Sequence, residues 1–179
     1  MTIPPPTISQ SLTTDQAVQR QNASLKALHE AALGLLDKID TEGLLETLIE
    51  RAAALTGTPH GYIYLRDPDR RVMIMRVGKG FFSRQLGRRV QMGQGMGGRV
   101  WQTEAPVLVP DYSSWPGRLD DASLDGLRCI VGIPLKSDRQ VRGVIGLAHV
   151  DPGRQFDPED VAVLERFAAL ALLALEKAT

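Results

Sequence analysis

The sequence predicts an α+β fold built on an antiparallel sheet. Two pairs of short apolar segments are each joined by a polar turn, which is typical of β-hairpins. Apolar residues with helical spacing precede the first pair and follow the second, so helices are expected at both ends. With 179 residues, 43% of them apolar, the chain is long enough for one substantial core and too short for two.

The first 22 residues differ in composition from the rest of the chain. They contain three consecutive prolines, Pro4 to Pro6, and a stretch rich in Ser, Thr and Gln with few large apolar side chains. Such a segment buries too little surface to offset the entropy lost on ordering. We therefore expect residues 1–22 to be a mobile leader and residues 23–179 to form a single domain.

Two helices are expected before the first hairpin. Apolar residues fall on one face over residues 25–37, and the same spacing is repeated over residues 44–53. Asp40 or Thr41 can cap the second helix, and Gly57-Thr58-Pro59 is a typical helix end.

The hairpins are expected in the middle and in the last third of the chain. The first joins residues 61–65 to residues 72–77 through the turn-forming Asp67-Pro68-Asp69-Arg70. The second joins residues 130–135 to residues 141–148, and its polar linker is too short to hold a crossover helix. Two shorter strand candidates are residues 88–92 and 107–109.

The last helix has a clear start signal. Asp157 can serve as N-cap, Pro158 suits the first helical position, and Glu159 and Asp160 complement the positive end of the helix dipole. Apolar residues lie on several faces of this helix over residues 157–177. We therefore expect it to be buried on more than one side.

Composition excludes several classes of partner. Lys plus Arg and Asp plus Glu both number 21, so no overall field attracts nucleic acid or an anionic membrane. The longest apolar run, Phe167–Leu175, is far shorter than the ~20 residues of a membrane helix, and the N-terminus lacks a signal-peptide pattern. The single cysteine, Cys129, excludes an intrachain disulfide framework and a multi-thiolate metal site. We expect a cytoplasmic protein with no metal ligands and no direct nucleic-acid partner.

A glycine-rich stretch, "GQGMGGRVW" at residues 93–101, contains the dinucleotide-binding pattern G-x-G-x-x-G, and Asp111 follows at the spacing of a ribose-binding acid. A dinucleotide-binding unit needs a crossover of a dozen or more residues, but only nine positions separate Gly98 from Val107. The glycines instead predict a sharp turn into a short helix, roughly residues 97–103.

The same stretch begins a longer pattern that resembles GAF domains. "GQGMGGRVWQTEAPVLVPDY" is followed by "SSWPGR", "GIPLKSDRQVRGVIGLAHV" and "FDPEDVAVLERFAALALLALE", and the resemblance covers residues 25–177. It implies a central antiparallel sheet with the terminal helices on one face, and a pocket roofed by a short helix and a loop on the other. GAF domains are mostly small-molecule-sensing, dimerising modules attached to histidine kinases, cyclic-nucleotide enzymes and transcriptional activators.

The resemblance places a candidate ligand site between the short helix and the loop at residues 111–126. Backbone N–H groups at the helix start suit an anionic group, Trp115 suits stacking on a ring, and Arg118 suits pairing with a carboxylate or phosphate. Alternatively, the glycines serve close packing, Trp115 pins the loop and Asp111 caps a turn. The expected ligand-binding residues are Gly97, Gly98, Arg99, Asp111, Trp115 and Arg118.

The chain departs from several GAF subgroups. Some cyclic-nucleotide-binding members carry an Asn-Lys pair ahead of Phe-x-x-x-Asp-Glu, whereas this chain has His149-Val150, and Val161 replaces the Glu. Bilin-binding relatives use a Cys commonly followed by His, but Ile130 follows Cys129. Relatives that reduce methionine sulfoxide use several cysteines. We therefore expect Cys129 to be a small buried hydrophobe and His149 to be a hydrogen-bonded residue at a strand end.

These observations predict a non-catalytic sensory domain that binds a small molecule of unspecified identity. It is expected to form a homodimer through helices 25–37 and 157–177, and to signal along the second helix to a kinase, cyclase or transcription regulator outside this chain. Two alternatives remain open. One is a reductase of free methionine sulfoxide on the same fold, and the other is a structural dimerisation module with a collapsed pocket.

Overall fold

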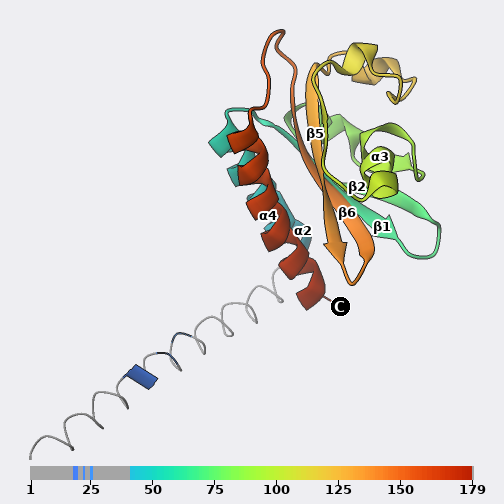
Figure 1. The fold of residues 1–179 in the computed structure, drawn as a ribbon. Helices are drawn as coiled ribbons and strands as arrows, with labels where there is room; N and C mark the ends of the chain where they lie inside the picture. The colour runs from blue at the N-terminus through green and yellow to red at the C-terminus, as the bar shows by residue number, and fades with distance from the viewer. Residues whose placement is uncertain (1–17, 20–21, 23–24, 26–40, 179) are drawn as a thin grey trace, which may run out of the picture. The chain divides into compact units, whose positions relative to one another are not determined.

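The structure, a computed structural model, describes residues 41–178 together with residues 18, 19, 22 and 25 (Figure 1). The chain divides into two units, residues 1–40 and 41–179. The four described residues of the first unit are helical. Nearly all of the expected leader and of the expected helix at residues 25–37 lies outside the described residues, so both stay predictions.

The second unit is built on a six-stranded sheet in which every strand is antiparallel to its neighbours. The strand order is β3-β2-β1-β6-β5-β4, so the first and the last long strands pair at the centre. Both expected hairpins are confirmed, as β1-β2 and β5-β6, and the two short strand candidates are the edge strands. The strands are β1 (His60–Asp67), β2 (Val72–Lys79), β3 (Arg89–Val90), β4 (Val107–Val109), β5 (Cys129–Ser137) and β6 (Gln140–His149).

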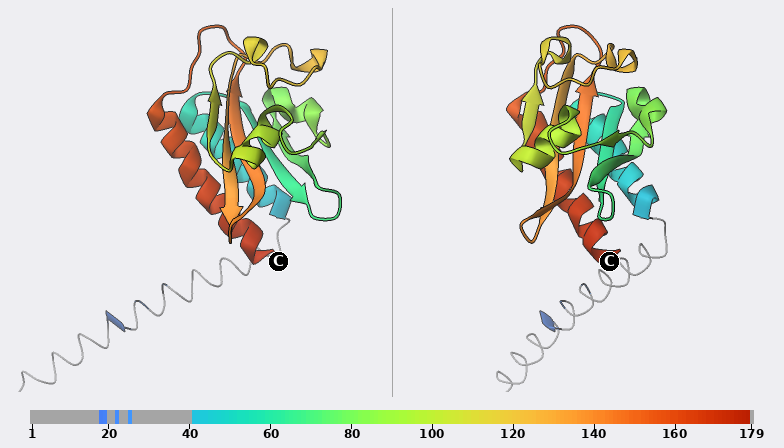
Figure 2. Two further views of the ribbon diagram at one scale, coloured as in Figure 1. Left: turned by 45° about the vertical axis from the view of Figure 1, so that its right-hand side comes forward. Right: turned by 90° about the vertical axis from the view of Figure 1, so that its right-hand side faces the viewer.

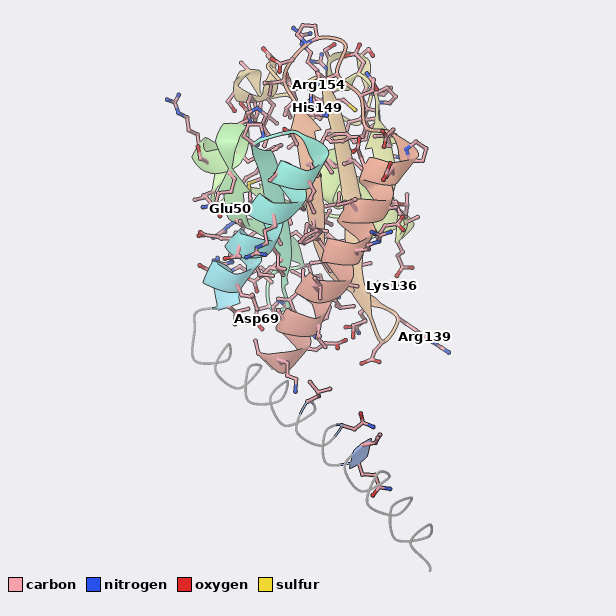
Figure 3. The ribbon with its side chains drawn as sticks, turned by 90° about the vertical axis from the view of Figure 1, so that its left-hand side faces the viewer. Glu50, Asp69, Lys136, Arg139, His149 and Arg154 are labelled. Carbon is pink, nitrogen blue, oxygen red and sulfur yellow. The ribbon has the colours of Figure 1, made fainter. Side chains whose placement is uncertain are left out.

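Two long helices cover one face of the sheet, and one short helix lies on the other face (Figures 1 and 2). The long helices are α2 (Thr41–Thr56) and α4 (Pro158–Lys177), which lie side by side and run in opposite directions (Figure 3). The short helix is α3 (Gly95–Thr103). Three 3₁₀ helices complete this second unit: η1 (Gly80–Gln85), η2 (Tyr112–Ser114) and η3 (Ala122–Leu124). The α+β fold is thus as expected.

The ends of the long helices follow from local signals in the sequence. Asp157 accepts a hydrogen bond from the Asp160 backbone, and the Asp160 side chain accepts one from the Asp157 backbone, which forms a capping box. Pro158 occupies the first turn, as expected. At the other helix, α2 ends where Gly57 takes a φ of 76°, a conformation that favours glycine.

Each face of the sheet carries its own apolar core, because strand side chains alternate between the two faces. On the helix side, Leu45 and Ile49 of α2 and Leu164 of α4 are fully buried against the sheet. A Cβ at Gly61 would lie 2.6 Å from Ile49, so glycine at this position lets α2 approach β1 closely. The opposite face carries a more aromatic core, which forms the candidate site.

The glycine-rich stretch does not form a dinucleotide-binding unit. Because all strands of the sheet are antiparallel, it lacks the parallel crossover that such a unit requires. Instead, α3 joins the two edge strands β3 and β4 across one face. The helix begins at Gly95, two residues before the expected start, where φ is 60°.

Candidate functional site

The floor of the site is one tyrosine lying across two glycines. Tyr62 on β1 pairs with Gly146 on β6, which pairs with Gly132 on β5. A Cβ at Gly146 would lie 2.1 Å from the Tyr62 ring, so the ring occupies the space that a side chain would fill. The Tyr62 hydroxyl donates a hydrogen bond to the Val131 carbonyl at 2.9 Å. The Tyr62 side chain therefore extends from β1 over β6 to β5 and forms the floor of the site.

The roof consists of α3 and the loop at residues 110–128. Met96 of α3 packs near Gly132, where a Cβ would meet it at 3.3 Å. In the loop, the Tyr112 hydroxyl accepts a hydrogen bond from the Leu119 backbone at 3.0 Å, which folds the loop back on itself. Leu124 and the Tyr112 ring are buried beneath it. The roof is thus held by apolar packing together with a few polar contacts.

A small cavity lies between the floor and the roof. Its volume is about 20 Å³. One water needs on the order of 10–15 Å³, so the cavity has room for about one water. It is lined by Tyr62, Tyr64, Met75, Phe82, Arg88, Met96, Tyr112, Leu119, Leu124, Leu127 and Ile130.

The lining is apolar and aromatic, with a few polar groups. Burial raises the pKa of Tyr62, Tyr64 and Tyr112, so all three phenols are neutral at physiological pH and keep their hydroxyl donors. Arg88 is the one cation among the lining residues. An apolar pocket with a few convergent polar groups is typical of small-molecule sites.

Arg88 connects the sheet side of the cavity to the roof. Its Nη2 lies 2.6 Å from Asp121 Oδ2, and its Nε donates to Gln85 Oε1 at 2.9 Å. Gln85 Nε2 in turn donates to Ser123 Oγ at 3.2 Å. Hydrogen bonding to Arg88, and then to Ser123, lowers the pKa of Asp121 to about 2. Asp121 is therefore ionised at physiological pH and pairs with the guanidinium.

Arg88 also lines a surface cleft with a volume of about 600 Å³. Arg88, Gln85 and Ser123 line it, together with Arg84. The Arg88 side chain thus lines both the small cavity and the larger surface cleft.

Two of the expected site residues meet each other at the edge of the roof. The Arg99 guanidinium carbon lies 6.0 Å from the centroid of the Trp115 ring, and that ring packs against Tyr112 with centroids 5.8 Å apart. The Arg99 Nε atom is buried without a hydrogen-bond partner among the described residues. Arg118 is exposed, and its backbone donates to the Trp115 carbonyl.

The other expected site residues have local contacts. Asp111 is exposed and caps η2, and hydrogen bonds from Ser113 and Ser114 lower its pKa. A Cβ at Gly97 would meet the Tyr64 ring at 3.0 Å. The backbone N–H of Gly98 donates to Gln94 within the helix turn.

None of the six expected residues lines the cavity, although their sequence neighbours do. Their role in ligand binding therefore stays a proposal. Sequence reasoning missed Tyr62, Tyr64 and Arg88, which all line the cavity. The spacing of Tyr62 and Tyr64, two apart on one strand, indicates a shared face and could have identified both tyrosines. Arg88 directly precedes an edge strand, a position that favours exposure, but its side chain is only 19% exposed.

Cys129 and His149 lie on the opposite side of the sheet from the cavity. Cys129 belongs to the helix-side core, where burial raises the pKa of its thiol. His149, its neighbour across β5 and β6, is labelled in Figure 3. Its ring stacks on Phe156 with ring centroids 4.3 Å apart. Among the described residues, no group of three or more His, Cys, Asp or Glu side chains could hold a metal ion, and no helix is long and apolar enough to cross a membrane.

The structure combines an antiparallel sheet, two long helices on one face and a roofed aromatic cavity on the other, which places the chain in the class of α+β domains with a site on the free face of the sheet. Residues 38–176 match the family described as GAF domain, and the chain belongs to that family. It is 27% identical over 146 residues to the Nif-specific regulatory protein of Herbaspirillum seropedicae. This match covers 77% of the chain and 27% of that protein, so the chain spans about a quarter of its length.

Solved structures share the fold. The GAF domain of a phosphoenolpyruvate-protein phosphotransferase from Coxiella burnetii has a TM-score of 0.70 at 19% identity, covering 86% of this chain and 93% of that one. Free methionine-R-sulfoxide reductase from Neisseria meningitidis, solved in complex with its substrate, has a TM-score of 0.64 at 22% identity, covering 85% of this chain and 90% of that one. At these identities the likeness shows the fold alone.

Proposed function

We propose that this chain is a non-catalytic sensory GAF domain that binds a small molecule between the Tyr62 floor and the α3 roof. The cavity carries this proposal, because it joins an aromatic lining to a guanidinium that also faces a surface cleft. Since the cavity has room for only about one water, binding of a larger molecule requires the roof to lift. A roof with a closed and an open position is a two-state element that a ligand can bias.

The output of this sensor is proposed to pass through α4 in a homodimer. One face of α4 is buried through Leu164, Ala168 and Ala171, whereas Leu170 is 50% exposed and Leu173 is 40% exposed. A second apolar stripe thus lies outside the monomer's core, as expected for a helix that is buried on two sides. We propose that the effector is a kinase, cyclase or transcription regulator outside this chain, and that the protein is cytoplasmic and makes no direct nucleic-acid contact.

The reductase alternative is less well supported by the geometry. Thiol chemistry on a ligand in the cavity would need a cysteine at the cavity wall. Cys129 is buried in the core on the other face of the sheet, and the chain has no second cysteine. A buried thiol with a raised pKa is a poor nucleophile, because the thiolate is the reactive form. We therefore infer a binding domain and not an enzyme.

The sensory proposal can be tested by filling the cavity. Protein purified from its own cells is expected to carry a small molecule that native mass spectrometry detects. Met96 lines the cavity and Met92 is exposed, so Met96→Trp should lose that mass while Met92→Trp keeps it. If a folded Met96→Trp protein retains the ligand, or if the wild type carries none, the structural-module alternative is favoured instead.

A further inference from the structure

Arg88 can contact a ligand in the cavity or in the surface cleft, because its side chain lines both. It is the one cation on the cavity lining, and it also lines the surface cleft. Two of its guanidinium nitrogens already make hydrogen bonds, to Gln85 and to Asp121. A guanidinium presents its donors as a planar fork that matches a carboxylate.

The carboxylate that pairs with Arg88 belongs to Asp121, in the loop that forms part of the roof. Asp121 lies 33 residues further along the chain, directly before η3. Its second oxygen accepts hydrogen bonds from the backbone and the hydroxyl of Ser123. The side chain of Asp121 is 37% exposed, so its release into water restores solvation at little cost.

We propose that Arg88 is the anion-recognising residue of the cavity and that Asp121 is an internal substitute for the carboxylate of a ligand, which it keeps out while the roof is closed. This inference rests on the proposed function of the same site. A ligand carboxylate replaces Asp121 on Arg88, and the freed loop lifts to make room for the rest of the molecule. Because the remaining lining is apolar and aromatic, the ligand is a small organic carboxylate with an apolar or aromatic body.

The chain offers matched controls for both members of this pair. Asp120, directly before Asp121, is exposed, and Arg89, directly after Arg88, is exposed on β3. Asp120→Asn and Arg89→Met therefore repeat the charge changes of Asp121→Asn and Arg88→Met without touching the ion pair. Arg88→Lys keeps the charge and removes the fork.

The test is calorimetric titration of these folded variants with benzoate, with its neutral isostere benzamide and with inorganic phosphate. Asp121→Asn should bind benzoate at least tenfold more tightly than the wild type, because the internal competitor is gone, and Arg88→Met should not bind it. Arg88→Lys should bind more weakly than the wild type. The two controls should match the wild type, and benzamide should not discriminate among the variants.

Several outcomes would overturn the inference. These are equal benzoate affinity in Asp121→Asn and Asp120→Asn, benzoate binding that survives Arg88→Met, a response to phosphate in place of benzoate, or no benzoate binding in any variant. The proposed sensory function fails separately. If the cell-derived ligand disappears in Met96→Trp but persists in Arg88→Met, the cavity is the sensor site and Arg88 is not its anion receptor.

Discussion

For single residues of this domain, burial and hydrogen bonding determine which charge state is favoured. Arg88 is held by partners on two segments, whereas Cys129 and His149 are buried away from the cavity. Burial lowers the pKa of His149, and nearby Arg154 lowers it further, while Asp160 and Asp151 oppose the shift. The folded protein therefore disfavours the charged imidazole at this position.

This shift predicts that stability decreases in mild acid. The unfolded state, with a histidine pKa of about 6.5, binds a proton that the folded state resists, so stability is fully present above that pH and falls as pH drops below it. Thermal unfolding between pH 8 and pH 5 should show this loss, and His149→Gln should flatten the profile.

The contribution of a second histidine can be separated in the same experiment. Burial also lowers the pKa of His60, so His60→Gln is measured beside His149→Gln. Loss of the Asp121 ion pair belongs to a lower window, between about pH 4 and pH 2, because its pKa is lowered to about 2. An unchanged acid slope in His149→Gln would contradict the prediction.

The candidate site was only partly accessible to sequence reasoning. The resemblance to GAF domains predicted a roof made of a short helix and the loop at residues 111–126, and polar and aromatic residues in that loop suggested function. The ion pair of Arg88 was not predicted, because its partner Asp121 lies in a distant loop and no local sequence pattern indicates such a contact. The cavity lining was missed for a related reason, since alternate residues of several strands meet only after the sheet has formed.

At the scale of elements, the sequence predicted helices and hairpins better than their pairing. The cap at Asp157 and the turn near Pro68 are local signals, and both mark real element boundaries. The pairing of β1 with β6 joins segments about eighty residues apart, so it has no local signature. The start of α3 at Gly95 differed from expectation because the positive φ that begins the turn falls within the glycine run.

The tyrosine floor leads to a prediction about the sheet. Gly146→Ala should destabilise the fold by about 1–3 kcal/mol, because the added methyl would overlap the Tyr62 ring. Denaturant unfolding measures this loss. Tyr62→Phe retains the ring and serves as the control for the lost hydroxyl alone, at about 0.5–1.5 kcal/mol.

A double-mutant cycle separates this clash from a general effect of substitution. Combining Gly146→Ala with Tyr62→Val should cost less than the sum of the two single changes, because the smaller side chain leaves room for the methyl. Strict additivity would show that Tyr62 does not lie over Gly146 in solution.

For the whole molecule, the central prediction is assembly. Sedimentation should show a homodimer at micromolar concentration, and Leu170→Glu combined with Leu173→Glu should shift it toward monomer, because both side chains are exposed on α4. Leu172 is partly buried in the core, so a charge there would also disturb folding. Leu86→Glu, exposed on another segment, is the control. A monomeric wild type would contradict the predicted dimer.

The opposite directions of α2 and α4 have a mechanical consequence. The start of α2 and the end of α4 lie at the same end of the helical layer, away from the end where His149 and Arg154 lie (Figure 3). Polypeptide joined to these two points is therefore attached along a single edge of the domain. An axial shift of α4 against α2 would move one attachment point past the other along the helix axes, so segments joined at this edge would receive that displacement without an intervening element.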